Sequence, residues 1–133
     1  MKIKKIKTKT HAQLKRELDK VFSDYIRERD KYTCITCTKQ GTKADIQNGH
    51  YIERNKIGTR YDEENCNAQC VTCNVWKKGN LRVYAVQLIR KYGEGVLERL
   101  LGKANSNQGK KMSVSILEEK IIYYKNKIAQ LRG

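Results

Sequence analysis

The chain has 133 residues, of which 29 are Lys or Arg and 14 are Asp or Glu, so its formal net charge is +15. This length favours one compact domain with appendages, and the positive charge indicates a polyanionic partner, with nucleic acid favoured over an anionic membrane surface. No apolar stretch is long enough to span a bilayer and no secretory signal follows the basic start, which excludes an integral membrane protein and predicts a cytoplasmic one. The hydrophobic fraction of 38% is low for a self-sufficient core, so a metal staple or a partner subunit would help to complete it.

The chain begins with a predicted basic arm and a helix. Residues 1–10 contain five lysines. They are expected to form a flexible arm, which either contacts phosphates or only keeps the chain soluble. Residues 11–31 form the next unit, an amphipathic helix with apolar residues at helical spacing. Its apolar face consists of Leu14, Leu18, Val21, Phe22, Tyr25 and Ile26.

Residues 32–80 are predicted to form the functional core. Glycine and asparagine punctuate its first half, which indicates a metal-binding turn and then a two-stranded hairpin around Asp45–Ile52. The segment Asn65–Cys70 is expected to be a loop. A helix is predicted to start near Cys70 and to run to Lys78, with Gly79-Asn80 as its stop signal.

Residues 81–133 are expected to form a helical extension. An apolar stripe over residues 81–102 is interrupted by glycines, and a polar, flexible linker is predicted near 103–112. Residues 113–132 have apolar side chains at steps of three and four, in a heptad-like pattern, and Ser115-Ile116-Leu117-Glu118 has the sequence of a capping box. This last helix either packs back on the first helix or provides a dimer contact.

Two C-x-x-C pairs bracket a single histidine in the core. The pairs are Cys34 with Cys37 and Cys70 with Cys73, and His50 lies between them. Four thiolates at this spacing predict one tetrahedral zinc site. Because cysteine fills all four positions, this Zn²⁺ would be structural, and catalysis would need other residues. The fifth cysteine, Cys66, is interpreted as a structural thiol.

Three polar residues beside the cysteine pairs are candidates for catalysis. His50 is the predicted general base, because a neutral imidazole can take a proton from water near physiological pH. Asn74 directly follows Cys73 and offers an amide oxygen suited to magnesium, which would stabilise the charge that builds on a phosphodiester. Asn65 is expected to hydrogen-bond His50 and thereby to select its tautomer. Ordinary turn or helix hydrogen bonding is the alternative for both asparagines.

Four segments carry a resemblance to a known family. They are Gly49-His50-Tyr51-Ile52-Glu53-Arg54, Arg60-Tyr61-Asp62-Glu63-Glu64-Asn65, Gln69-Cys70-Val71-Thr72-Cys73-Asn74 and Lys78-Gly79-Asn80. In combination they resemble the NinG (Rap) family of lambdoid phages over nearly the whole chain, and more broadly the zinc-bearing HNH endonucleases. The resemblance implies an α+β fold, with a zinc-stapled ββα-metal (HNH) core and flanking amphipathic helices. It also implies cleavage of branched DNA, including Holliday junctions and D-loops, in phage recombination.

The resemblance implies roles for individual residues. His50 would be the general base, Asn65 the middle asparagine of the motif, and Asn74 a ligand of Mg²⁺ or Mn²⁺, in an H-N-N variant. A phage or prophage protein acting in the cytoplasm of its bacterial host would fit this assignment.

One position departs from the HNH pattern. Many HNH enzymes have a metal-binding aspartate before the base, and this chain has Gly49 there. The second magnesium ligand must then come from another position. Asp45 and Asn48 are the nearest candidates, and Glu53 or a water molecule is a further option.

Several basic residues flank the candidate site and are predicted to contact DNA phosphates. They are Arg54, Lys56, Arg60, Lys77 and Lys78. The leading hypothesis is therefore a metal-dependent endonuclease selective for branched DNA, and a homodimer is expected because symmetric cleavage of a junction takes two active sites. The alternatives are a non-catalytic, zinc-stapled module that binds branched DNA, and an HNH nickase with another phage role.

Overall fold

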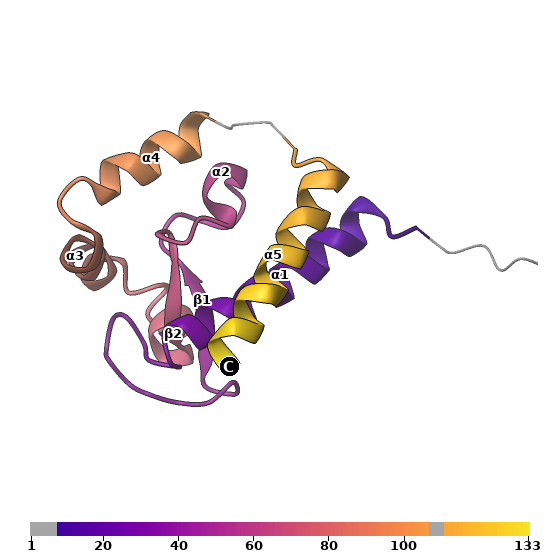
Figure 1. The fold of residues 1–133 in the computed structure, drawn as a ribbon. Coiled ribbons are helices and arrows are strands. Elements are labelled where there is room, and N and C mark those ends of the chain that lie inside the picture. Colours follow the sequence, from indigo (N-terminus) through magenta and orange to yellow (C-terminus); the bar gives the residue numbers. More distant parts are fainter. Residues whose placement is uncertain (1–7, 107–110) are drawn as a thin grey trace, which may run out of the picture.

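The computed structural model describes residues 8–106 and 111–133, and in it a two-stranded sheet lies between two pairs of helices (Figure 1). The elements are α1 (His11–Arg29), β1 (Ile46–His50), α2 (Ile57–Arg60), β2 (Cys66–Cys70), the π-helical turn η1 (Thr72–Trp76), α3 (Leu81–Tyr92), α4 (Val96–Ser106) and α5 (Val114–Arg132). Helices α1 and α5 lie on one side of the sheet, and α3 and α4 lie on the other. The architecture is mixed α and β, as expected.

The sheet differs from the predicted hairpin. Strand β1 pairs antiparallel with β2, with Ile46 opposite Cys70 and His50 opposite Cys66. The prediction of a hairpin within Asp45–Ile52 and of a loop at Asn65–Cys70 is therefore wrong. All five residues of β2 are buried, and buried backbone groups need hydrogen-bond partners, which β1 supplies. A sequence of cysteine, asparagine, alanine and glutamine has little strand propensity, so only this pairing makes the segment a strand.

Helix α1 agrees closely with its predicted range. Thr10 is its N-cap: the Thr10 hydroxyl accepts from the Gln13 N–H, and the Gln13 side chain accepts from the Thr10 N–H. Helix α5 begins after Ser113, whose side chain accepts from the Ile116 N–H. The capping residue is thus Ser113, two positions before the predicted Ser115, because this hydroxyl lies where the first unpaired amide of the helix needs an acceptor.

Helix α5 packs against α1, so the first of the two alternatives for it is confirmed. The two helices run in the same direction: His11 Nε2 lies 2.7 Å from the Met112 carbonyl oxygen, and Arg132 Nη2 lies 3.0 Å from Glu28. Between them lies the largest apolar cluster, which also contains Tyr61 and Cys66 from the core. The buried residues of α5 are Leu117, Ile121, Tyr124 and Ile128.

The C-terminal extension breaks where the glycines are. Gly93 ends α3 with a φ of 95°, a conformation that glycine adopts without strain. Helix α4 then continues to Ser106 because Ala104 is buried, so the start of the predicted linker at 103–106 is helical. The remainder of that linker at 107–110, and residues 1–7 of the predicted arm, lie outside the described residues. Within the described ranges, no helix has the length and hydropathy needed to cross a membrane.

Candidate functional site

The two C-x-x-C pairs converge at one end of the sheet. Their four sulfur atoms lie within 4.8 Å of one another, and Cys37 Sγ lies 3.6 Å from Cys70 Sγ. Each pair forms the same type of turn, because the N–H of Cys37 donates to Cys34 Sγ at 3.5 Å and the N–H of Cys73 donates to Cys70 Sγ at 3.4 Å. The paired C-x-x-C segments thus form one cluster.

This cluster fits a zinc ion. Four sulfurs at ~2.3 Å from a tetrahedral zinc lie about 3.8 Å apart, and the cluster is already close to that spacing. Burial raises the pKa of the Cys34 thiol, but hydrogen bonds from Thr36 and from backbone amides outweigh burial and lower this pKa to about 6. A thiolate at Cys34 is therefore accessible near neutral pH, whereas burial raises the pKa of Cys37 to about 12 and also raises that of Cys70, so that binding of a metal would release protons from these thiols. The four cysteines can bind a zinc ion.

His50 ends strand β1 and is held by a backbone carbonyl. Its Nε2 lies 2.9 Å from the carbonyl oxygen of Arg60. A carbonyl oxygen can only accept, so Nε2 carries the proton and Nδ1 carries the lone pair. Burial lowers the pKa of His50 more than the Arg60 hydrogen bond raises it, and the positive charges of Arg54 and Arg60 lower it further. The imidazole is therefore neutral at physiological pH, with Nδ1 as its basic atom.

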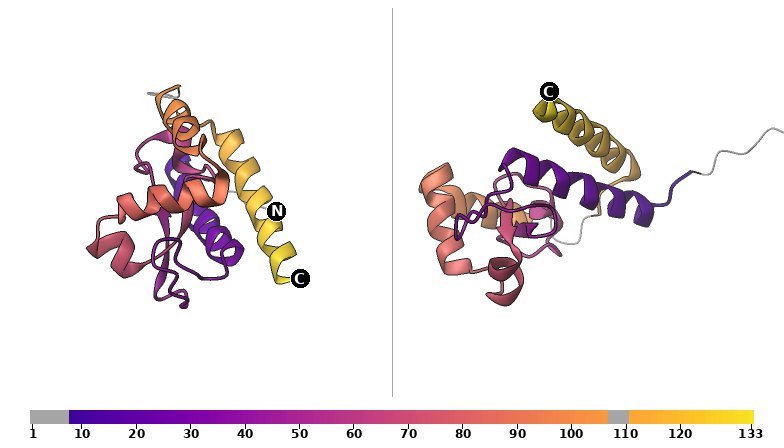
Figure 2. Two further views of the ribbon diagram at one scale, coloured as in Figure 1. Left: turned by 90° about the vertical axis from the view of Figure 1, so that its left-hand side faces the viewer. Right: turned by 90° about the horizontal axis from the view of Figure 1, so that it is seen from below.

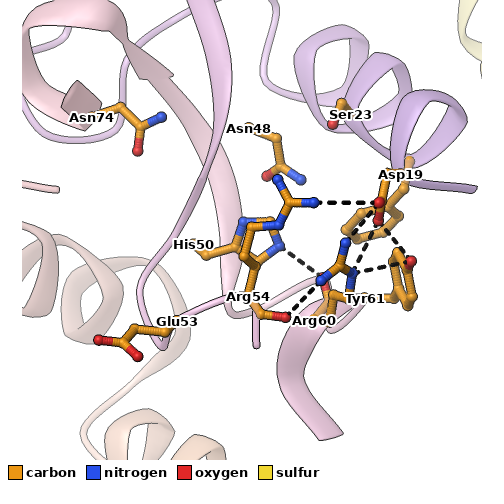
Figure 3. Close-up of a pocket in the computed structure, with 10 residues that line it drawn as sticks. Asp19, Ser23, Asn48, His50, Glu53, Arg54, Arg60, Tyr61 and Asn74 are labelled. Atoms are coloured by element: carbon orange, nitrogen blue, oxygen red, sulfur yellow. Dashed lines mark hydrogen bonds and ion pairs between the residues drawn. The ribbon is translucent and has the colours of Figure 1, made fainter. Parts of the chain in front are cut away.

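Arg60 is itself clamped by the first helix (Figure 3). Its Nη2 and Nε lie 2.6 Å and 3.0 Å from the carboxylate of Asp19, and its Nη1 donates to the Arg54 carbonyl at 2.9 Å. The Tyr61 hydroxyl donates to the same carboxylate at 2.6 Å. Burial would raise the pKa of Asp19, but the hydrogen bonds from Arg60 and Tyr61 lower it, so the carboxylate stays ionised. The prediction that Arg60 contacts DNA phosphates disagrees with this geometry, since its guanidinium is buried and paired.

Asn65 does not contact His50. It is fully buried, its Oδ1 accepts from the Ile52 N–H at 2.7 Å, and its Nδ2 donates to the carbonyl oxygens of Ile52 and Thr59, each at 3.0 Å. The predicted orientation of His50 by Asn65 is wrong, because the Arg60 carbonyl does this instead. Asn65 holds the loop between the strands, and that loop supplies the carbonyl. Asn65 therefore affects His50 only indirectly, through this loop and its Arg60 carbonyl.

Asn74 and Asn48 share a pocket with His50 (Figure 3). This open pocket has a volume of about 360 Å³ and lies between α1, β1 and η1. Asn74 Nδ2 donates to Gln47 Oε1 at 2.8 Å, which leaves the Asn74 amide oxygen available. Asn48 hydrogen-bonds the Cys66 thiol, and its buried Oδ1 has no hydrogen-bond partner among the described residues. Two amide oxygens thus accompany the His50 base.

An aspartate, which many HNH enzymes have at this position, would displace Gln69 if it replaced Gly49 in this fold. A Cβ atom on Gly49 would lie 2.0 Å from Oε1 of Gln69, which is fully buried beneath it. Asp45 does not replace the missing carboxylate, because it precedes the far end of β1 and its Oδ2 accepts from Thr42. Glu53 does line the pocket and is exposed. Of the candidates for a second magnesium ligand, Asn48 and Glu53 are therefore at the site and Asp45 is not.

The other residues that are predicted to contact phosphates differ in how exposed their side chains are. Arg54 lines the pocket with its side chain 66% exposed, and Lys77 and Lys78 are exposed just after η1. Lys56 is half-buried at the N-cap of α2. The helix predicted from near Cys70 to Lys78 is the shorter π-helical turn η1, with Val71 as its N-cap and Lys77 as its C-cap, and it places Asn74 beside the pocket.

Sequence reasoning missed Asp19, Tyr61 and Gln47. Asp19 and Tyr61 position the Arg60 backbone, and Gln47 fixes the Asn74 amide. An aspartate on the polar side of an amphipathic helix carries no signal for such a role, since its partner is 41 residues away. The fifth cysteine, Cys66, is fully buried and its Sγ lies 3.3 Å from the Arg60 carbonyl oxygen. Its interpretation as a structural thiol agrees with this place.

Comparisons with known proteins agree with the resemblance. The family model described as "Bacteriophage Lambda NinG protein" matches residues 1–133. Protein ninG of Escherichia phage 933W is 31% identical over 135 residues, covering 100% of this chain and 65% of the relative. Protein ninG of Escherichia phage lambda is 32% identical over 110 residues (81% and 53%), and that of Salmonella phage P22 is 34% identical over 102 residues (75% and 50%).

The chain is thus shorter than these curated relatives, spanning between half and two thirds of their length. No solved structure matches it. The family model covers all of the elements described above, from α1 through the cysteine cluster to α5. The chain belongs to the NinG family of bacteriophage proteins.

Proposed function

We propose that this protein is a metal-dependent endonuclease that cleaves branched DNA during phage recombination in the host cytoplasm. His50 is the general base, and its Nδ1 takes a proton from the water that attacks the scissile phosphodiester. Asn74 and Asn48 hold the catalytic Mg²⁺ or Mn²⁺ through their amide oxygens, with Glu53 at the rim of the same pocket. The four cysteines hold a structural Zn²⁺ within an HNH-type core.

The observation that carries this proposal is the arrangement around His50. Its Nε2 donates to the Arg60 carbonyl, so Nδ1 is the basic atom. The His50 side chain also lines an open pocket, together with Asn48 and Asn74. An amide oxygen buried without a partner, as in Asn48, costs free energy unless a ligand meets it. Oxygen atoms are the ligands that magnesium prefers. A purely structural histidine needs neither of these neighbours.

The bound metal would supply charge stabilisation on the phosphoryl oxygens and on the leaving oxygen. The chain's own residues supply the rest. The Arg60 carbonyl stabilises the imidazolium that forms when His50 takes the proton, because it accepts from Nε2 in both protonation states. Arg54, exposed at the pocket, and Lys77 and Lys78, exposed after η1, can neutralise neighbouring phosphates and position the strand.

The same proposal includes a homodimer, since a four-way junction has two strands to cut. The core-facing side of α5 is already used by α1. A dimer contact through α5 would therefore use its outer side, where Ile116, Ile122 and Tyr123 are exposed. Sedimentation with and without junction DNA measures this, and a monomer under both conditions would contradict the dimer.

The test of the proposed function is cleavage of a labelled four-way junction with magnesium or manganese. Wild-type protein is compared with His50→Ala, and a linear duplex of equal length is the control substrate. Junction-selective cutting that His50→Ala loses, with junction affinity retained, supports the proposal. Tight junction binding without cutting in either metal would identify a binding module instead. Equal cutting of junction and duplex would remove the selectivity for branched DNA but retain the nuclease chemistry.

A further inference from the structure

The chain has a single tryptophan, Trp76, and it lies on the surface. Its side chain ends the π-helical turn η1 and is 78% exposed, more than any other large hydrophobic residue described. Its neighbour Val75 is 52% exposed. Tryptophan is usually well buried, and a large ring left in water marks a surface that meets a partner. Both views in Figure 2 place this turn at the periphery of the molecule.

The backbone that presents Trp76 is rigid and strained. Three successive residues after it, Lys78, Gly79 and Asn80, have φ values of 50°, 91° and 47°. The left-handed conformation is unfavourable for lysine and persists only where the surroundings impose it. Two contacts do so: the Gly79 N–H donates to the Cys73 carbonyl at 3.0 Å, and Gln69 Nε2 donates to the Gly79 carbonyl at 2.9 Å.

The zinc cluster therefore braces this turn. Cys73 lies within η1, and its carbonyl oxygen accepts from the Gly79 N–H. Its Sγ lies 3.8 Å from the side-chain nitrogen Nδ2 of Asn80. Because the backbone of this turn is already held, only the Trp76 side chain loses conformational entropy when a partner packs on it. A turn whose backbone is held in this way favours contact of the ring with one flat surface, such as the face of a base.

The charge around Trp76 identifies the class of partner. Lys77, Lys78 and Arg82 are exposed beside it, on a chain with a net charge of +15. Alternation of an exposed aromatic ring with basic side chains is the pattern by which proteins bind unpaired nucleic acid, with the ring stacked on a base and the cations near phosphates. A partner protein with an apolar surface would gain nothing from the three cations.

The position of Trp76 relative to the proposed active site indicates which part of a DNA substrate the ring would contact. Asn74, two residues earlier, lines the His50 pocket. A five-residue turn is only about 7 Å long, whereas the grooves of duplex DNA are about 6 and 12 Å wide. Residues two apart in a helical turn point to different sides, so Trp76 faces away from the His50 pocket, and DNA with a phosphate beside His50 would meet the ring farther along its length. Inside a linear duplex both faces of every base are stacked, and a ring can reach a base face only where the stack is broken, as at a branch point.

We propose that Trp76 stacks on an unstacked base at the branch point of the DNA substrate, and that this contact contributes to the preference for branched over linear DNA. The inference rests on the proposed function, whose substrate recognition it specifies. Trp76 is a specificity-determining residue here and takes no part in proton transfer or metal binding. Cys73, one of the four clustered cysteines, holds the backbone of the turn that carries Trp76.

The experiment measures binding without added magnesium, so that nothing is cut and the zinc is retained. A four-way junction with 2-aminopurine at the branch and a linear duplex of equal length are titrated at one stated salt concentration. Trp76 is the only tryptophan, so fluorescence excited at the long-wavelength edge of tryptophan absorption, where the eight tyrosines absorb little, reports on this ring. The variants are Trp76→Ala, Trp76→Phe, which keeps an aromatic face, and the control Leu101→Ala, which removes a 58% exposed apolar side chain from α4.

We expect the junction to quench Trp76 emission and the duplex to quench it little. Loss of one base–aromatic stack weakens binding about 5- to 150-fold, so Trp76→Ala should weaken junction binding by this factor and duplex binding less than about 2-fold. Trp76→Phe should restore most of the junction affinity, and Leu101→Ala should bind as wild type. Equal affinity of Trp76→Ala and wild type for the junction would overturn the inference, as would an equal loss for junction and duplex.

Two outcomes separate this inference from the proposed function. Trp76-dependent junction binding without cutting in magnesium would support the inference and contradict the nuclease. Unchanged junction-selective cutting by Trp76→Ala would support the nuclease and overturn the inference. A Trp76→Ala protein that loses self-association, with DNA binding intact, would assign the ring to a second copy of the chain and also overturn it.

Discussion

At the scale of single residues, one hydrogen bond decides which nitrogen of His50 can act. Nε2 donates to the Arg60 carbonyl at 2.9 Å, and this leaves Nδ1 with the lone pair that the proposed base needs. The same buried surroundings lower the pKa of the imidazole, so the neutral form persists at lower pH than in an exposed histidine. Gly49 contributes by its lack of a side chain, because Gln69 occupies the space where a Cβ would be.

The lowered pKa of His50 gives a prediction for the dependence of cleavage on pH. Activity needs the neutral base, so kcat/KM should rise with pH through a midpoint below the ordinary histidine value of about 6.5. Folding stability has the same sign: the unfolded chain takes up the proton first, so stability is lost as pH falls from about 6.5 through the lower folded pKa.

Cleavage rates across this pH range and a proton NMR titration of the His50 ring measure both effects. The chain has only two histidines, so a His11→Gln variant assigns the His50 signal. An acidic limb centred above about 6.5 would contradict the role of a buried, neutral His50.

At the scale of elements, helix α1 reaches the candidate site through one carboxylate. Asp19 binds the Arg60 guanidinium with two hydrogen bonds, and the Arg60 carbonyl binds His50. The helix therefore does more than complete the apolar core with α5. It fixes the loop between the strands in the conformation that holds the base.

Substitution of Asp19 tests this connection. Asp19→Asn removes the charge that compensates the buried Arg60, and we expect a loss of about 1–3 kcal/mol in the free energy of unfolding. Cleavage should fall by up to about 100-fold, because small displacements of a catalytic group are costly. The matched control is Glu17→Gln on the same helix, which removes only surface ion pairs to Lys9 and Lys125 and should cost at most about 1 kcal/mol.

Urea unfolding and junction cleavage measure the two effects, and the NMR titration of His50 reports on its surroundings directly. If Asp19→Asn leaves the His50 pKa and the cleavage rate unchanged, the Arg60 carbonyl is held by the loop alone. Asn65, with three hydrogen bonds to that loop, would then be the residue that anchors it.

At the scale of the whole molecule, the cysteine cluster joins segments that are far apart in the sequence. Cys34 and Cys37 precede the sheet, while Cys70 and Cys73 end β2 and enter η1. One metal ion would thereby hold together the Cys34–Cys37 segment, the sheet and the turn η1, which carries both Asn74 and Trp76. A chain with a low apolar fraction depends on such a staple for part of its stability.

Removal of single cysteines tests the metal site. Cys73→Ala should lose zinc and unfold at lower temperature, since binding of a structural zinc contributes directly to folding. Cys66→Ala removes a buried thiol outside the cluster and should retain one zinc per chain. Metal content of the purified variants, with thermal unfolding before and after a chelator, measures this. Equal zinc content in both variants, whether full or absent, would contradict the assignment of the four ligands.

The sequence by itself determined the features that depend on neighbours along the chain. Helix α1 follows from its apolar periodicity, and the cysteine pairs follow from their spacing. The same local patterns singled out His50 and Asn74, which the structure places at one pocket. Each of these features needs only residues within a few positions of one another, so a linear pattern contains them.

Only the tertiary structure decided the contacts between distant segments. Cys66–Cys70 is a strand because β1 pairs with it, and α5 lies on α1 although its heptad pattern fits a dimer equally well. Arg60 is a basic residue of the kind that contacts DNA, but it is buried because its guanidinium pairs with the Asp19 carboxylate at 2.6 Å. Burial and hydrogen bonding in the folded chain override local propensity at such positions, since the free energy of an unpaired buried group exceeds any local preference.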